Sequence, residues 1–137
     1  MEDEIRVKFI VSEDIQTQQV ANSPILQNLI INPLMVMRSK WIPTTLSMGI
    51  SIVTSGIDFS IPRTVQIFIT NVQNGNRIYD SGEQKINMPQ MGMSDNFNFN
   101  LEIKNADFEN EGRYDISLVL DNEVYSDYFK VLKAIGN

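Results

Sequence analysis

The chain has 137 residues and a formal net charge of −6, from 11 basic and 17 acidic residues, and it contains neither histidine nor cysteine. This length is sufficient for a hydrophobic core, so we expect residues 1–137 to form one domain that needs no metal or other cofactor. The two missing residue types exclude disulfides, thiolate nucleophiles, Ser-His-Asp triads and the usual zinc ligands, which leaves only carboxylate chemistry.

The net negative charge and the hydropathy pattern also exclude two classes of partner, nucleic acid and membrane. The basic residues are scattered, so the footprint of a nucleic-acid-binding protein is missing. The N-terminus alternates polar and apolar residues, whereas a secretory signal begins with basic residues and continues with an apolar run. The apolar stretches are shorter than the roughly 20 residues of a spanning helix. We therefore expect a soluble, cytoplasmic protein that binds neither nucleic acid nor membrane.

The first strand is predicted for residues 4–12, where Ile5, Val7, Phe9 and Val11 form the buried face and alternate with Arg6, Lys8 and Ile10. Residues 13–24 are polar and end in a turn-favouring NSP sequence, so we expect a loop or one short helical turn there. Residues 25–31 are apolar and β-branched, and they predict a strand that Pro33 interrupts or confines to a sheet edge. A short strand at 34–37 follows.

The next strand is the clearest one-sided strand of the first half of the chain. Leu46, Met48, Ile50 and Ile52 occupy one face, and Gly49 lies on the other. A glycine at this place favours a bulge or the close approach of another backbone. The following connection, residues 54–63, carries three apolar side chains that we expect to cover one end of the core: Ile57, Phe59 and Ile61.

Further strands are predicted at 64–72 and 77–80, joined by a hairpin turn because Asn74 and Gly75 accept positive φ at low cost. Residues 85–88 resume that strand, and a methionine-containing loop begins at Pro89. Phenylalanine and other apolar residues then alternate with polar ones over 96–104, which predicts another amphipathic strand.

The segment from 108 to 131 has the pattern of a β-hairpin. Tyr114, Ile116, Leu118 and Leu120 share one face of its first strand, Asp121 and Asn122 supply the turn, and residues 124–131 return. Altogether seven to nine short strands are expected and no helix of appreciable length. The chain is therefore predicted to be all-β, a two-sheet antiparallel sandwich in which each sheet covers the apolar face of the other.

The heptapeptide NEGRYDI, residues 110–116, resembles the corner at which a strand begins in immunoglobulin-like sandwiches. The resemblance implies that Gly112 and Tyr114 form a structural corner, with the Tyr114 hydroxyl bonded to nearby backbone, and that Ile116 stands where antibody domains place a cysteine. The order of strands and turns is also similar to that of small bacterial and phage proteins of the same class. That likeness implies a bacterial or phage origin and no known reaction.

Two groups of carboxylates are candidates for chemistry. Asp107, Glu109, Glu111 and Asp115 offer oxygen ligands of the kind that calcium prefers, although a solvated loop in an acidic protein has the same composition and is the interpretation that we prefer. Glu83, Asp95 and Glu102 are candidates for the paired carboxylates of a glycosidase, but some pair of acids lies close together in any chain this acidic. We therefore assign no catalytic, cofactor-binding or metal-binding residue.

Aromatic and methionine side chains are the candidates for contact with a partner, since they combine large area with adaptable packing. The candidate interaction surface comprises Trp41, Tyr79, Met91, Met93, Tyr125 and Tyr128. Packing of these residues at sheet margins, or of the methionine loop with Met88 over its own core, is the alternative. Two sheets also expose edge strands, so self-association through an edge strand is a second candidate mode of contact.

Three classes of function remain. The first is a non-enzymatic binding or interaction module with a protein partner of unknown identity, and we prefer it. The second is an acidic inhibitor or decoy encoded by a phage or mobile element, which requires acids gathered on one face. The third is a carboxylate-dependent glycosidase, which requires two acids in one aromatic-lined cleft.

Overall fold

The computed structural model describes residues 4–19, 21, 26–90 and 93–135, and these residues form twelve strands and no helix. No helix in the described part of the chain is long and apolar enough to cross a membrane. The strands are β1 (Arg6–Gln19), β2 (Leu26–Leu34), β3 (Val36–Ser39), β4 (Thr44–Ser55), β5 (Ile57–Asp58), β6 (Arg63–Asn71), β7 (Arg77–Asp80), β8 (Gln84–Ile86), β9 (Met93–Ser94), β10 (Phe97–Phe108), β11 (Gly112–Leu120) and β12 (Glu123–Lys133).

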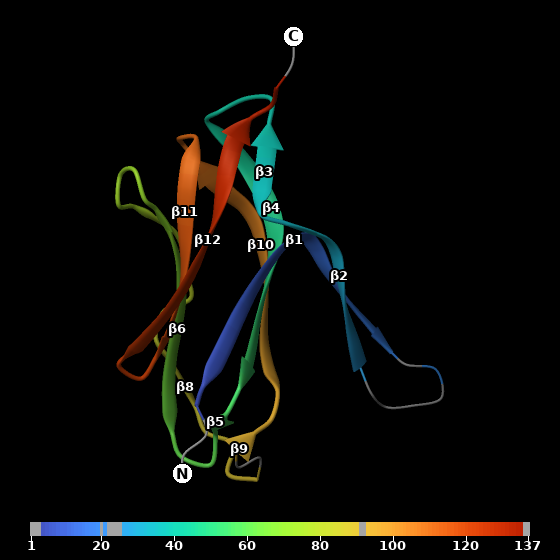
Figure 1. Cartoon of the computed structure of the whole chain (residues 1–137), viewed down its shortest axis with the longest axis vertical. Helices are drawn as coiled ribbons and strands as arrows, with labels where there is room; N and C mark the ends of the chain where they lie inside the picture. The colour runs from blue at the N-terminus through green and yellow to red at the C-terminus, as the bar shows by residue number, and fades with distance from the viewer. Residues whose placement is uncertain (1–3, 20, 22–25, 91–92, 136–137) are drawn as a thin grey trace.

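The strands are arranged in two facing sheets, with a small third ribbon (Figure 1). One sheet has the order β10-β4-β1-β2. The other has the order β3-β12-β11-β6-β7, with β8 also paired to β6. All pairs are antiparallel except β3 with β12, which are parallel. The short segments β5 and β9 pair with each other and raise the strand number above the seven to nine expected.

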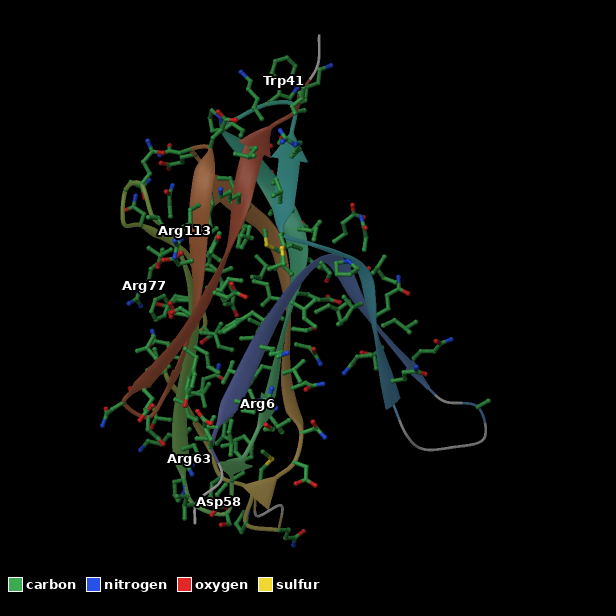
Figure 2. The ribbon with its side chains drawn as sticks, viewed as in Figure 1. Arg6, Trp41, Asp58, Arg63, Arg77 and Arg113 are labelled. Carbon is green, nitrogen blue, oxygen red and sulfur yellow. The ribbon has the colours of Figure 1, made fainter. Side chains whose placement is uncertain are left out.

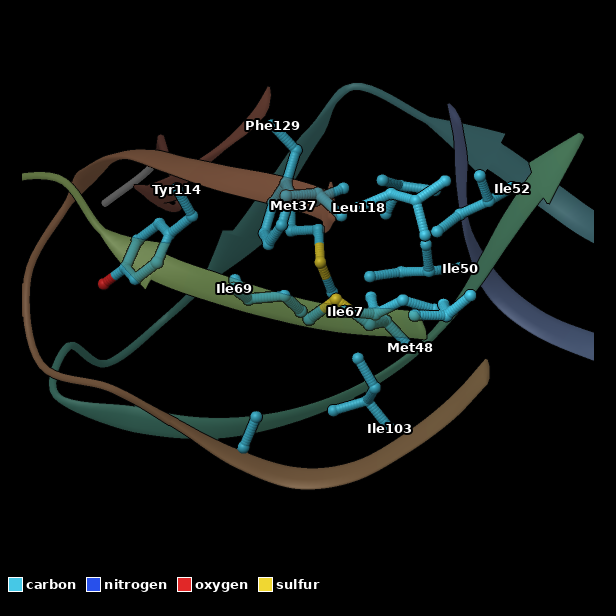
Figure 3. Packing of buried hydrophobic residues seen from close by; sticks show 14 of the residues in the cluster. Met37, Met48, Ile50, Ile52, Ile67, Ile69, Ile103, Tyr114, Leu118 and Phe129 are labelled. Carbon is cyan, nitrogen blue, oxygen red and sulfur yellow. The ribbon is translucent and has the colours of Figure 1, made fainter. Parts of the chain in front are cut away.

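The core lies between the two sheets, as the alternating pattern predicts. In Figure 3 the labelled side chains of β4 and β10 face those of β6 and β11, and Met37 of β3 and Phe129 of β12 complete the cluster. Ile57 and Phe59 are fully buried and cover one end, as expected, but Ile61 is 50% exposed. The prediction for Ile61 is therefore wrong, because the chain turns outward there before β6 begins.

The order of the strands is that of an immunoglobulin-like sandwich. In such domains strands A, B and E are neighbours in one sheet and strands C, F and G in the other. Here β1, β4 and β10 are neighbours in the first sheet, and β6, β11 and β12 in the second, in the chain order that the lettering requires. After β2 the chain crosses from the first sheet to the second, where β3 pairs with β12. The all-β, immunoglobulin-like fold is thus established.

Tyr114 forms the corner at the start of β11. Its hydroxyl donates a hydrogen bond of 2.6 Å to the carbonyl oxygen of Asn110, and its ring is fully buried. The rings of Phe108 and Phe129 lie 4.9 Å and 5.8 Å from it, centroid to centroid. Burial raises the pKa of the Tyr114 hydroxyl. Ile116, which takes the place of the antibody cysteine, is likewise fully buried in the core.

The prediction for residues 13–24 is wrong over most of the segment. Strand β1 continues to Gln19, where a loop or helical turn is expected from the polar composition. Gln16, Thr17 and Gln18 are exposed on both faces, so no apolar alternation marks this part of the strand. Its extended conformation is instead imposed by pairing with β2, which runs antiparallel beside it from Gln19↔Leu26 to Val11↔Leu34.

Candidate interaction surface

The acids proposed as calcium ligands do not converge. No group of three or more His, Cys, Asp or Glu side chains that could hold a metal ion occurs among residues 4–19, 21, 26–90 and 93–135. Asp115 instead accepts a 2.7 Å hydrogen bond from Arg113, and Glu111 accepts one from the backbone N–H of Lys133. Asp107 and Glu109 are exposed at the end of β10. These acids therefore either make local contacts or face solvent.

The acids proposed for glycoside hydrolysis lie on separate elements. Glu83 belongs to the connection between β7 and β8, Asp95 precedes β10, and Glu102 is in the middle of β10. All three side chains are exposed. A glycosidase needs its two carboxyl groups on either side of one sugar, in a shared cleft. The positions of these acids give that hypothesis no support.

The pKa values of three other carboxyl groups are lowered by hydrogen bonds. Asp80 has a pKa of about 2, because it accepts hydrogen bonds from Gln66, from the Gly82 backbone and from Arg77. Hydrogen bonds from Ser60 lower the pKa of Asp58, and one from the Thr64 backbone lowers that of Asp121. These three carboxyl groups are ionised near neutral pH, so they stabilise turns and cannot act as general acids.

The four aromatic residues of the candidate interaction surface are not gathered in one patch. Tyr79 and Tyr125 are half-buried and pack against the core. Trp41 is 69% exposed in the β3–β4 connection, where it lies at one end of the molecule (Figure 2). Tyr128 is 47% exposed on β12, with the Arg113 guanidinium 4.2 Å from its ring centroid. Only Trp41 and Tyr128 thus offer ring area to a partner.

The methionine loop falls largely outside the part of the chain that is described. Met91 is not among the described residues, and of Met93 only the backbone is described, within β9. Met88 is half-buried and packs against the core, and its N–H donates to the carbonyl oxygen of Phe59. For Met88 the structure therefore agrees with the alternative in which the loop covers its own core.

A different feature is prominent in the structure: a two-stranded arm that projects from the sandwich. We define the arm as residues 15–19 of β1 and 26–31 of β2. In Figure 1 these two strand ends leave the two sheets and point away from them. β2 makes its main contacts with β1. β2 has no counterpart in the immunoglobulin strand order. It lies beyond β1, which corresponds to strand A, the last strand of sheet A-B-E.

The arm contains no charged residue, unlike the rest of the molecule. No Asp, Glu, Lys or Arg occurs between Asp14 and Arg38, although 20% of the residues of the whole chain are charged. The side chains that alternate on the arm are amides, Thr17 and aliphatic groups, and Ile31 is 38% exposed. The acidic character of the chain therefore resides in the sandwich, and the arm is an uncharged extension of it.

The root of the arm is fixed by Ile15 and Gly49. The Ile15 side chain is buried, at 5% exposure, on the face of β4 where Gly49 has no side chain. A Cβ added to Gly49 would lie 2.5 Å from Ile15 Cγ1 and 2.9 Å from Ser12 Oγ. The close approach expected at this glycine is thus made by a side chain of β1 rather than by another backbone. This contact packs the first residue of the arm against β4.

The outer edge of β2 is open. Within the described chain no strand pairs with that edge, so its outward N–H and C=O groups have no strand partner. Natural edge strands are usually protected by charges, and four others here follow that rule: β3 carries Arg38, β7 Arg77, β8 Lys85 and β10 Glu102. β2 has only Pro33, near its end. From Leu26 to Ile31 it contains no charge, proline or glycine.

An apolar cleft continues from the arm into the sandwich. It has a volume of about 330 Å³ and lies where β2 crosses over to β3, between β1 and β12. Met35, at 83% exposure, and Tyr128 stand among its lining residues with Leu34 and Val36. Among the described aromatic residues of the candidate interaction surface, Tyr128 therefore lies at this cleft, near the root of the arm.

Comparisons with known proteins add little to these observations. No family model matches the chain, and no curated protein matches it in sequence. Among solved structures the chain is similar to a CARDB domain of the PF1109 protein from Pyrococcus furiosus, determined in complex with di-metal ions. The TM-score is 0.41 with 13% sequence identity, over 93% of this chain and 96% of that chain. Similarity at this level transfers neither ligand nor activity.

Proposed function

We propose that the protein is a non-enzymatic interaction module and that the arm is its contact element. The main observation in support of this proposal is the open, uncharged edge of β2. A strand with free backbone donors and acceptors binds a further strand by extending its sheet, a common mode of peptide recognition. The sequence Leu26–Ile31 combines aliphatic and amide side chains without a charge or a proline, the composition that favours such pairing.

The low stability expected of the arm by itself supports the same proposal. A two-stranded hairpin that packs on nothing else is at best marginally stable in water. Beyond Ile15 the arm has few contacts of its own, such as the 3.4 Å hydrogen bond between the side chains of Thr17 and Asn28. A third strand would complete the hydrogen bonds of β2 and cover its aliphatic side chains.

The decoy hypothesis has less support. It requires acids gathered on one face, whereas the exposed acids are distributed over both sheets, for instance Glu13 on β1, Glu102 on β10 and Asp127 on β12. Three further acids are paired with arginines: Asp80 with Arg77, Asp115 with Arg113, and Asp121 with Arg63. This distribution does not form the single acidic face that would fit a basic site.

Site-specific photo-crosslinking tests the proposed function. A photoreactive residue at Gln27, on the arm, is compared with one at Gln84, an exposed glutamine on β8, in cells of the organism that produces the protein. We expect a discrete crosslinked product from position 27 and none from position 84, with mass spectrometry identifying the second component. No product from position 27, or equal products from both positions, would refute the arm as the contact element.

A further inference from the structure

We infer that the strand that binds the edge of β2 is β2 of a second copy of this chain, running antiparallel to it about a two-fold axis. This inference rests on the proposed function and names its partner. The two copies would form one continuous sheet of the order β10-β4-β1-β2-β2-β1-β4-β10. The first argument for it is geometric: antiparallel pairing of identical edges is closed and self-complementary, so it ends at a dimer rather than a filament.

The second argument is electrostatic. Each copy carries a net charge of −6, so the two sandwiches repel each other if they meet face to face. The arm places the contact outside the sandwich, on the stretch between Asp14 and Arg38 that contains no charged residue. Two β2 edges therefore meet without the like-charge opposition that destabilises cross-strand pairs. A basic partner strand would instead favour an acidic arm, and the stretch between Asp14 and Arg38 contains no acidic residue.

The third argument is the match between the two edges. In an antiparallel pair about a two-fold axis, the central residue faces itself and the residues on either side of it face each other across the axis. With Asn28 at the axis, Asn28 faces Asn28, Leu26 faces Ile30 and Gln27 faces Leu29, so every pair is uncharged. Identical uncharged segments of about six residues pair readily in this way.

The absence of cysteine makes the inference directly testable by disulfide formation, because any disulfide must come from an introduced residue. The single variants Gln27→Cys, Asn28→Cys and Leu29→Cys are oxidised in the full chain, with Gln84→Cys on β8 as the matched control. Self-pairing near a two-fold axis brings two Cβ atoms to within about 4 to 5 Å, close to the distance of a disulfide. We expect a covalent dimer from at least one arm variant and none from the control.

Sedimentation equilibrium supplies the second readout. The unmodified chain is expected to dimerise, and Gln27→Lys to raise the dimer dissociation constant about tenfold, because it places two like charges on paired strands. Gln84→Lys makes the same change of net charge, from −6 to −5, on a different edge, and is expected to leave dimerisation unchanged or slightly stronger.

A chain that stays monomeric at high concentration would overturn the inference, and so would a dimer that crosslinks through position 84 but not through the arm. These results are separate from the test of the proposed function. A monomeric chain whose position 27 still crosslinks to a different protein would refute the second copy and retain the arm as the contact element. Failure of both experiments would refute both proposals.

Discussion

The contact between Ile15 and Gly49 allows one substitution to be worked out in detail. In an ordinary strand, alanine is more favourable than glycine by about 0.5 to 1 kcal/mol, because glycine loses more backbone entropy on folding. At position 49 the added Cβ would come within 2.5 Å of Ile15 Cγ1. Cγ1 is bonded directly to the branched Cβ of that side chain, so it cannot move without the strand or the rotamer moving with it. Overpacking of this kind costs about 1 to 3 kcal/mol.

We therefore expect Gly49→Ala to lower the free energy of unfolding by about 1 kcal/mol, and by no more than about 2.5 kcal/mol, after the gain in backbone entropy is subtracted. Urea denaturation followed by tryptophan fluorescence or circular dichroism measures it. The control is the same substitution in an Ile15→Ala background, where the obstructing side chain is missing. Ile15→Ala alone loses the packing of a buried isoleucine, which costs about 2 to 5 kcal/mol.

The double variant distinguishes a clash with Ile15 from a general effect of alanine at position 49. If Ile15 causes most of the destabilisation, Gly49→Ala becomes less destabilising once Ile15 is alanine, because only the 2.9 Å approach to Ser12 Oγ then remains, and the interaction energy of the cycle is about 1 kcal/mol or more. If Gly49→Ala stabilises the protein with Ile15 in place, or has the same effect in both backgrounds, the described root of the arm is wrong.

Three further predictions follow from particular contacts. Tyr114→Phe removes the hydroxyl that donates to Asn110 and is expected to lower the free energy of unfolding by about 1 to 2 kcal/mol with the fold intact, as urea titration will show; a change near zero would contradict the corner. Asp80, with a folded pKa of about 2 against its ordinary 3.8, stabilises the fold fully above that ordinary value and loses this contribution as the pH falls through about 2. NMR titration of its carboxyl carbon should give the low value in the parent chain and a higher one in Gln66→Ala, whereas an ordinary value in the parent would refute the hydrogen-bond assignment. Replacing residues 17–28 by Asn-Gly is expected to leave the thermal unfolding of the sandwich nearly unchanged and to abolish dimerisation in sedimentation equilibrium; loss of the fold would show that the arm is part of the core structure.

The strands of the sandwich could be predicted because each has one face against the core. Alternation by two reveals such strands directly, and Phe99, Leu101 and Ile103 of β10 or Tyr114, Ile116 and Leu118 of β11 show it clearly. The corner could be predicted because its residues are close together in the sequence. The turn at Asn74 and Gly75 is similarly local, and Gly75 has the positive φ of 76° that such a turn favours.

The arm could not be predicted in the same way, since neither face of residues 16–18 is buried and no apolar period marks them as a strand. Their conformation depends on a partner strand, β2, with which they share backbone hydrogen bonds. The sequence nevertheless holds a signal for the candidate site. The lack of any charged residue between Asp14 and Arg38, in a chain that is one fifth charged, marks the one stretch where an edge is unprotected.

The aromatic surface was a poor guide to the candidate site because exposure depends on the three-dimensional course of the strands. Tyr125 and Tyr128 lie three residues apart on β12 and so point to opposite faces: Tyr125 packs against the core, and Tyr128 faces outward. The sequence does not reveal which of two alternating faces meets the facing sheet when both carry tyrosine.

Hydrogen exchange of the β2 backbone tests the central claim most directly, because it reports on the edge itself in the unmodified chain. The amides of residues 26–31 that do not bond to β1 are followed at low and at high protein concentration. The account predicts that their protection rises with concentration, while that of β7, an edge strand protected by Arg77 and Asp80, does not change. Equal, low protection of these β2 amides at both concentrations would contradict pairing of the β2 edges.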